Sequence, residues 1–264
     1  MACENQFLFQ AHQFYCYVYQ ESMRYEHSLS GWLDNATFLL IPLTLIYFFS
    51  MVIYPFWDGN FDLFYLQTVW AEWQSFNAGV LLFLSSMFAL RLTIYNETEQ
   101  RKRNFLARKA FLPKALIEVS NYCRLSCKFV GGQLHIHKVP ILIDSKLIFK
   151  DCIEYAEPCV AKYLAYMILR LQSHETYITA IEMNDSASAD RINMILWQLG
   201  ELHALSYKMY DFAAGQKEFD NNPIIFEEYL TSYRTLGINF NDFEGLENLT
   251  KKAIMEGYLR NFEI

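Results

Sequence analysis

The sequence predicts an all-α protein built as a two-helix transmembrane hairpin followed by a cytoplasmic helical bundle. Three observations support this fold class. The 264 residues are 53% hydrophobic and only 19% charged, whereas soluble domains carry about 25% charged residues. Residues 1–100 hold 11 charged side chains, of which only Arg24 and Arg91 are basic. The remaining residues hold 20 of the 22 Lys and Arg and show apolar repeats of helical period.

This layout predicts three regions: an aromatic segment at 1–33, a two-span membrane module at 34–95, and a cytoplasmic helical domain at 96–264. The low Gly and Pro content excludes collagen-like and low-complexity architectures. A net charge of −7 argues against a dedicated nucleic-acid binder, because such proteins are usually basic.

Residues 1–33 are rich in aromatic side chains and almost free of charge. Two interpretations remain open for this segment: a helix that lies in the membrane interface or packs against the spans, or a partly ordered aromatic tail. The aromatic residues concerned are Phe7, Phe9, Phe14, Tyr15, Tyr17 and Tyr19.

Residues 35–57 form the first predicted span. This stretch contains no charged residue over 23 positions and is bracketed by Asp34 and Asp58. As a helix it would be about 34 Å long, enough to cross a hydrocarbon core of roughly 30 Å. Its twelve Leu, Ile, Phe and Val residues favour insertion by about 4–7 kcal/mol in total, before the polar residues are subtracted.

Residues 73–95 form the second predicted span, most apolar from Trp73 to Leu90. Ser75 with Gly79, and Ser85 with Ala89, are pairs of small residues four positions apart, which allow two helix backbones to approach closely. The pairs fit packing on the first span or on a second copy of the chain, and the sequence does not separate these alternatives.

The flanking charges predict the orientation. The predicted loop Asp58–Glu72 contains three acidic residues and no Lys or Arg, whereas basic residues follow from Arg91 to Lys114. Positive residues stay on the cytoplasmic side, so both termini are expected in the cytoplasm. An aromatic belt is expected at the outer face, formed by Trp57, Tyr65, Trp70 and Trp73. The basic run 101–114 fits an anchor on anionic lipid, or a docking strip for an acidic partner or nucleic acid.

The cytoplasmic region is expected to be helical almost throughout. A helix over 97–130 should continue from the second span and kink or restart at Pro113. Gly131 and Gly132 should end it, before an extended passage from Gln133 to Asp144. Later helices are expected at 145–155, 158–183, about 188–213 with Ser186 or Ser188 as its cap, 223–236 and 240–262.

No phosphate loop, dinucleotide fingerprint, GxSxG elbow, HExxH motif or EF-hand loop occurs. We therefore expect no enzymatic activity and assign no catalytic, cofactor-binding or metal-binding residue. One cluster leaves two interpretations open, a tetrahedral zinc site or ordinary packing of free cysteines, although its spacing matches no common zinc finger. It comprises Cys123, Cys127, His135 and His137.

Two Arg–His pairs invite comparison with helical ribonucleases whose active-site Arg and His are separated by four to six residues. Three residues separate Arg170 from His174, and eleven separate Arg191 from His203, so neither pair fits. Arg170 and His174 are expected to be a solvated pair on one helix face. Glu201 and His203 should point to different faces of their helix, which makes them a poor acid–base pair.

Two passages carry a resemblance to a known group of proteins. Asn104–Leu116 (NFLARKAFLPKAL), with Val119 and Tyr122, directly follows the membrane module, and Cys152–Leu164 (CIEYAEPCVAKYL) continues to Gln172. Over roughly 35–180 the chain resembles small bacterial two-span proteins, which include the transmembrane effector of retron anti-phage systems.

This resemblance implies a toxin-like effector of abortive infection in the bacterial inner membrane. A reverse transcriptase bound to its RNA–DNA product would hold the effector inactive, and its release would damage the membrane and arrest growth. Membrane lipid and a second copy, bound through the second span, are the other expected partners, and no cofactor is expected. Two further functions remain open: a non-enzymatic membrane anchor or adaptor subunit, and a membrane-tethered helical nuclease.

Overall fold

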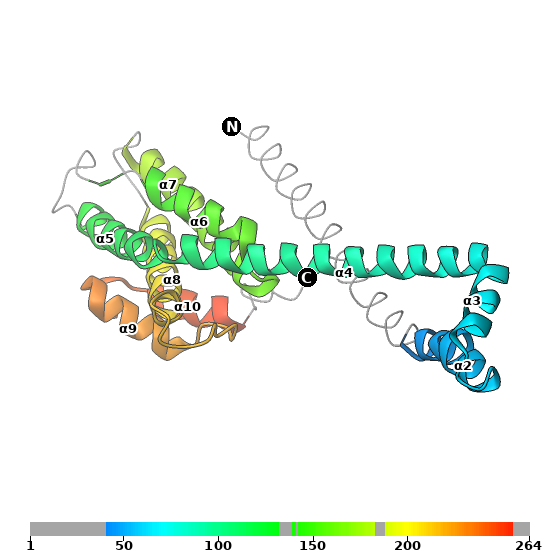
Figure 1. The fold of residues 1–264 in the computed structure, drawn as a ribbon. Coiled ribbons are helices and arrows are strands. Elements are labelled where there is room, and N and C mark those ends of the chain that lie inside the picture. Colours follow the sequence, from blue (N-terminus) through cyan, green and yellow to red (C-terminus); the bar gives the residue numbers. More distant parts are fainter. Residues whose placement is uncertain (1–40, 132–138, 141, 183–187, 256–264) are drawn as a thin grey trace, which may run out of the picture. The chain divides into compact units, whose positions relative to one another are not determined.

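The computed structural model describes residues 41–131, 139–140, 142–182 and 188–255 (Figure 1). All regular elements in these ranges are helical, so the all-α class is confirmed as a hairpin followed by a helical bundle. The chain divides into two compact units between Ile94 and Tyr95, one residue from the predicted boundary of the membrane module. The aromatic segment 1–33 and the first residues of the first span lie outside the described residues.

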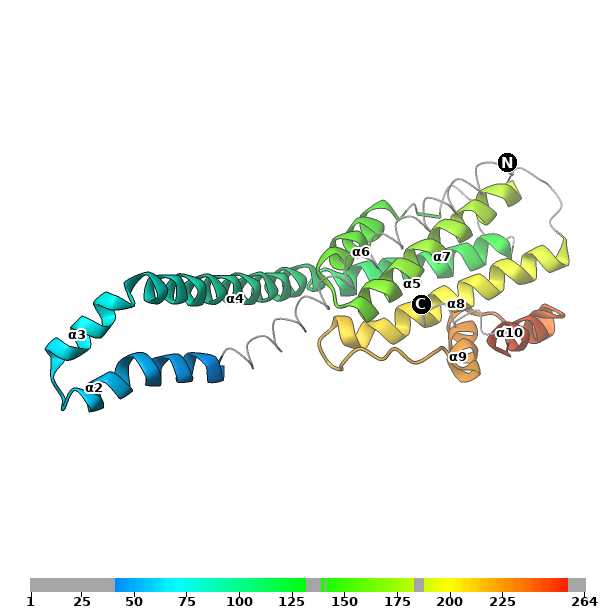
Figure 2. The same ribbon diagram turned by 90° about the vertical axis from the view of Figure 1, so that its right-hand side faces the viewer.

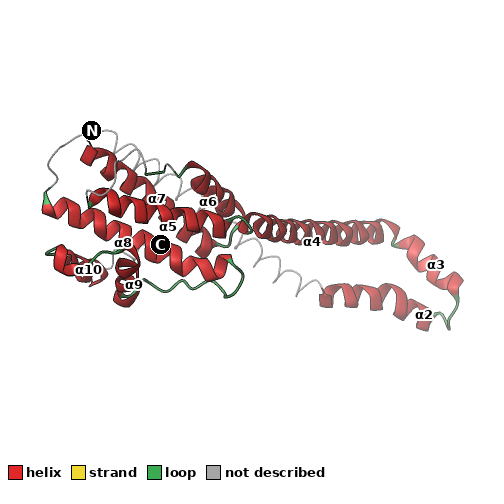
Figure 3. Cartoon of the chain, turned by 90° about the vertical axis from the view of Figure 1, so that its left-hand side faces the viewer, coloured by secondary structure: helices red, strands yellow, loops and turns green. Residues whose placement is uncertain are grey.

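The first unit contains two helices that are long and apolar enough to cross a membrane, Ile41–Asp58 and the start of α4 (Gln74–Lys109). The first helix includes a π-helical turn, η1 (Phe49–Ile53), and ends as α2 (Tyr54–Asp58). Figure 3 shows the two helices as the arms of a hairpin with α3 (Leu63–Glu72) at its turn.

The connection 58–72 was predicted as a loop, and that prediction is wrong for its last ten residues. After a turn from Gly59 to Asp62, the chain forms α3. The Asp62 carboxylate accepts a hydrogen bond from the Phe64 N–H at 2.9 Å, which satisfies one free donor of the first helical turn. Acidic residues on both sides obscured a short helix whose interior holds no charged residue.

The predicted continuation of the second span is confirmed, because α4 runs without a break from Gln74 to Lys109. The helix then stops, and α5 (Leu112–Val130) begins with Pro113 in its first turn. Proline lacks a backbone N–H and fits a first turn, where no intrahelical acceptor would be used. Gly131 is the C-cap of α5, as predicted.

The later helices follow the prediction with shifted starts, except that the single helix predicted from 240 is wrong, because a 3-10 turn ends at Asp242 and the next helix begins at Leu246. α6 (Ile143–Tyr155) begins two residues earlier than expected, and α7 (Pro158–Glu182) begins at the predicted proline. Ser188 is the N-cap residue of α8 (Ala189–Ala213), although its side chain makes no capping hydrogen bond. The described part of the chain ends in α9 (Phe226–Leu236), the 3-10 turn η3 (Phe240–Asp242) and α10 (Leu246–Met255). Most of the expected extended passage 133–144 lies outside the described residues.

Helix α8 is the central element of the bundle. It packs against α5, α7, α9 and α10, with α9 and α10 on the side opposite α6 and α7 (Figure 2). Its residues from Ile195 to Ser206 are all buried. A Cβ atom added at Gly200 would lie 2.3 Å from Tyr233 Cε1, so glycine permits the close approach of α8 and α9.

Candidate functional site

The hairpin exposes large apolar side chains around both helices. Leu45, Leu82 and Phe88 are 64%, 70% and 71% exposed, and Pro55 and Asn77 are the buried residues of the described unit. A water-soluble helix would place such side chains against a core. The exposed apolar surface of the described hairpin is therefore a candidate interaction surface.

Trp70 links α3 to the first helix. Its indole Nε1 donates a hydrogen bond to the Met51 carbonyl at 2.7 Å. Met51 belongs to the π-helical turn η1, and Pro55, four residues later, has no N–H to donate to its carbonyl. The indole supplies this carbonyl with a donor from α3. The sequence predicts Trp70 as part of an aromatic belt. In the structure its hydrogen bond to Met51 connects α3 to the first helix and closes the hairpin.

A second polar contact joins the two arms. The Tyr47 hydroxyl donates to Asn77 Oδ1 at 3.0 Å, while Asn77 Nδ2 is buried without a hydrogen-bond partner. The predicted small-residue face of α4 is open at Gly79, where an added Cβ atom would meet no atom within 4 Å. Packing of this face on a second copy stays a prediction.

Arg170 lies in a half-buried polar cluster with Tyr166 and the fully buried Glu201, which corrects the predicted solvated pair. Arg170 Nε lies 2.9 Å from Glu201 Oε2 and donates to the Tyr166 hydroxyl at 2.8 Å. The Tyr166 hydroxyl donates to Glu201 Oε1 at 2.7 Å. Burial raises the pKa of Glu201, although Arg170 and Tyr166 oppose the shift.

His174 is also buried, but its side chain contacts a different helix. Its Nδ1 is 2.8 Å from the Tyr122 hydroxyl of α5, and its Nε2 has no partner. Burial lowers the pKa of His174 to about 3, so the imidazole is neutral in the folded bundle. His174 and Arg170 are one helical turn apart but contact different helices. His174 is fully buried and the Arg170 side chain is only 16% exposed, so the predicted solvated pair is wrong.

Glu201 and His203 belong to separate sites, as expected from their positions on α8. Glu201 contacts α7 through Arg170 and Tyr166, whereas His203 lines a hollow between α5 and α8. Among the described residues, Glu201 and His203 therefore do not form an acid–base pair.

The two cysteines of the possible zinc cluster lie in the bundle core or at its edge. Cys123 is fully buried, and burial raises its pKa well above the ordinary value. Burial also raises the pKa of Cys127 to about 12. Zinc binds the thiolate, so this setting favours ordinary packing. Within the described ranges no metal-binding group of His, Cys, Asp and Glu occurs, and His135 and His137 lie outside those ranges.

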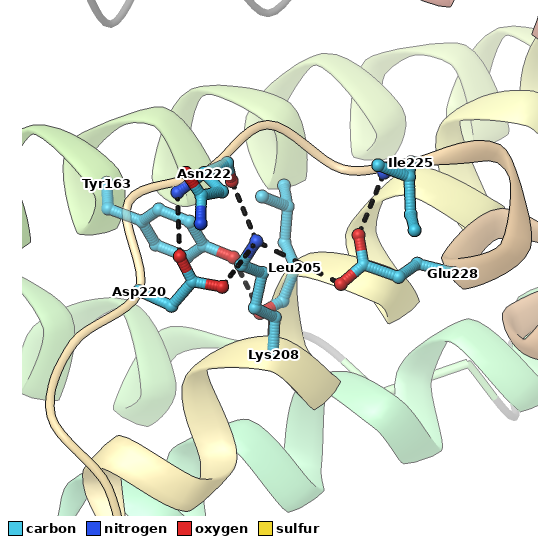
Figure 4. A network of polar contacts seen from close by, with 7 residues as sticks. All are labelled: Tyr163, Leu205, Lys208, Asp220, Asn222, Ile225 and Glu228. Carbon is cyan, nitrogen blue, oxygen red and sulfur yellow. Dashed lines mark hydrogen bonds and ion pairs between the residues drawn. The ribbon is translucent and has the colours of Figure 1, made fainter.

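A third polar network joins the end of α8 to the segment that leads to α9 (Figure 4). Lys208 Nζ lies 3.1 Å from Asp220 Oδ2 and donates to the Asn222 carbonyl at 2.7 Å. The Glu228 carboxylate accepts from the Ile225 N–H at 2.8 Å at the start of α9. These bonds fix a connection without regular structure, and they give Lys208 a structural role.

The basic run 101–114 is partly used within the bundle. Arg108 pairs with Asp151 of α6 at 3.1 Å. Lys109 Nζ lies 3.6 Å from the centre of the Phe212 ring, and burial lowers the pKa of this lysine. These two side chains hold the end of α4 on the bundle, so the run is less available to lipid or an acidic partner than its sequence suggests.

Comparison with protein-family models, curated proteins and solved structures finds no match for this chain.

Proposed function

We propose that this protein is a non-enzymatic membrane effector whose hairpin inserts into a bilayer while its helical bundle binds a partner. The observation that carries the proposal is the exposure of the hairpin's apolar side chains, such as Leu82 and Phe88. Burying one such side chain is worth about 1.5–3 kcal/mol, and lipid is the environment that can bury them on all sides of both helices.

The polar contacts of the hairpin fit an apolar solvent. Within hydrocarbon a backbone carbonyl must find a donor in the protein, and Trp70 supplies one to Met51. One buried amide group, Asn77 Nδ2, remains without a partner. A buried amide without a partner destabilises the present packing of the hairpin, which suits an effector that changes state.

In the proposed orientation both termini and the bundle are cytoplasmic, in the bacterial inner membrane. The partner complex would hold the effector inactive, as in the retron systems that the sequence resembles, and release would permit membrane damage. The buried positions of His174 and His203 favour this function over a nuclease.

Inducible expression of the full chain alone tests the proposal. Growth and propidium iodide entry are followed together, and arrest with dye entry is expected. Leu82→Arg places a charge on the exposed face of the second span, at an insertion cost of about 2.5–3.5 kcal/mol, and should abolish the effect. Leu147→Arg is the matched control on an exposed position of α6. Normal growth with the protein in the membrane would contradict the effector and support an adaptor.

A further inference from the structure

A hollow in the described part of the bundle lies outside the networks above. Its volume is about 110 Å³, and it opens between α5 and α8. An engineered cavity of roughly 150 Å³ accepts benzene, so this smaller hollow, which is open to solvent on one side, takes an aromatic ring only in part. Its lining residues are Leu116, Ile117, Ser120, His203, Ser206, Tyr207 and Tyr210.

The mouth of the hollow is apolar and open to solvent. Tyr207, Ile117 and Tyr210 are 71%, 48% and 38% exposed. Tyrosines around a pocket are typical of protein interfaces, where they provide large contact area at low entropic cost. Nothing in the described part of the bundle covers these three side chains.

The wall of the hollow holds an unsatisfied polar group. His203 is 6% exposed, and its buried Nδ1 has no hydrogen-bond partner. Leaving such an atom unsatisfied costs about 1–3 kcal/mol. The neighbouring Ser206 hydroxyl already donates to the Leu202 carbonyl at 2.8 Å. A phenol hydroxyl can donate or accept, so a tyrosine entering the hollow would satisfy His203 Nδ1 in either tautomer, provided that the rim side chains move apart to expose this buried atom.

Positive charge lies next to the hollow on α5. Arg124 follows Ser120 by one helical turn and is close enough to contribute to the lowered pKa of His203. Lys128 follows one turn later, and both side chains are at least partly exposed. Among the described residues neither forms an ion pair. Acidic side chains flanking a docked ring would therefore meet complementary charge.

We propose that the α5/α8 hollow is the docking site for an acidic segment of a partner protein that inserts one tyrosine side chain. The hollow would be the surface through which the bundle binds the partner of the proposed function. Only the consequence of binding rests on that proposed function. Two cations along one helix are few for nucleic acid, which is usually bound through many phosphate contacts.

The test is binding of a fluorescein-labelled heptapeptide, one tyrosine with three glutamates on each side, to the full chain in phosphatidylcholine nanodiscs. Fluorescence anisotropy should show about tenfold weaker binding for the same peptide with alanine in place of tyrosine. Ser120→Trp, which fills the hollow, should abolish binding. Tyr207→Ala and Arg124→Glu, both at exposed positions, should each weaken it several-fold without affecting the fold.

Lys150→Glu on an exposed position of α6 is the matched charge control and should bind the peptide like the unmodified chain. Equal binding of the tyrosine and alanine peptides, or unchanged binding to Tyr207→Ala and Arg124→Glu, would overturn the proposal. So would Arg124-dependent binding of a single-stranded RNA 12-mer without binding of the peptide. Peptide binding does not depend on membrane damage. A failure of peptide binding, which contradicts the docking site, is therefore distinguishable from a failure of growth arrest, which contradicts the proposed function.

Discussion

The hairpin and the bundle use the same apolar residue types in opposite ways. Leu164 in α7 is fully buried, whereas Leu82 in α4 is 70% exposed. Polar groups differ as well, because the bundle contains an ion pair with a fully buried carboxylate, whereas the Tyr47–Asn77 and Trp70–Met51 contacts of the described hairpin are hydrogen bonds between neutral groups. The bundle is stabilised by contacts within the chain, while the hairpin depends on its solvent. Substitutions should therefore have very different effects in the two regions.

The largest effect is expected for the buried ion pair of the bundle. Arg170→Met removes the cation and leaves the fully buried Glu201 without a countercharge, which should cost about 3–5 kcal/mol. The double variant Arg170→Met/Glu201→Leu should recover most of this loss. Urea unfolding of the full chain in detergent, followed by circular dichroism, measures both. A double variant as unstable as the single one would show that the charge is not the cause.

The next effect compares one residue type in the two regions. Leu164→Ala leaves a cavity in the core and should lower the free energy of unfolding by about 2–5 kcal/mol. Leu82→Ala at the exposed hairpin position should leave the free energy from the same urea transition unchanged within about 0.5 kcal/mol. Equal losses at both positions would mean that the hairpin is packed like the bundle.

A pH effect should come from His174. Burial lowers its pKa to about 3 from an ordinary 6.5, so below pH 6.5 the unfolded chain takes up a proton that the folded bundle does not. Stability from this group is constant above pH 6.5 and falls between pH 6.5 and 3, by about 1.4 kcal/mol per pH unit. From pH 7 to 4.5 the loss is roughly 2–3 kcal/mol.

Unfolding of His174→Phe across the same pH range is the control. Its stability should depend less steeply on pH by about one bound proton, although the loss of the Tyr122 contact lowers stability at every pH. An identical slope in both chains would contradict the buried neutral state of His174.

The smallest effect on stability is expected from alanine substitution of Gly200 and Gly79, two glycines within helices. Gly200→Ala would bring a methyl group against the Tyr233 ring and should cost about 1–3 kcal/mol. A methyl group added by Gly79→Ala would meet no atom within 4 Å and should be neutral for the hairpin monomer. Thermal unfolding checks the first variant, and membrane recovery checks the second. Tolerance of alanine at Gly200 would show that α8 and α9 pack less closely than described.

The sequence predicted the fold well where the signal is local. Pro113 marks the start of α5, Gly131 marks its end, and the uncharged stretches mark both arms of the hairpin. Helix α3 was missed because its short apolar stretch lies between acidic residues and has no clear period. The ends of a helix depend mainly on residues close to them in sequence. This explains why the ends of α5 were predicted and why α3, which lacks such a signal, was missed.

The polar sites were less predictable because their partners are distant in sequence. Glu201 lies 31 residues from Arg170, and Tyr122 lies 52 residues from His174. The four-residue spacing along α7 places Arg170 and His174 on the same face of the helix. It does not indicate which other helices pack against that face. One available signal was the position of Glu201 between Leu199, Leu202 and Leu205, a buried stripe of α8, where a carboxylate needs a partner.

Membrane extraction tests the central claim most directly. Membranes from bacteria expressing the full chain are washed with alkaline carbonate and centrifuged at high speed without detergent. Insertion of both apolar helices predicts that the protein stays in the pellet and enters solution only with detergent. Recovery in the detergent-free supernatant would contradict the membrane hairpin.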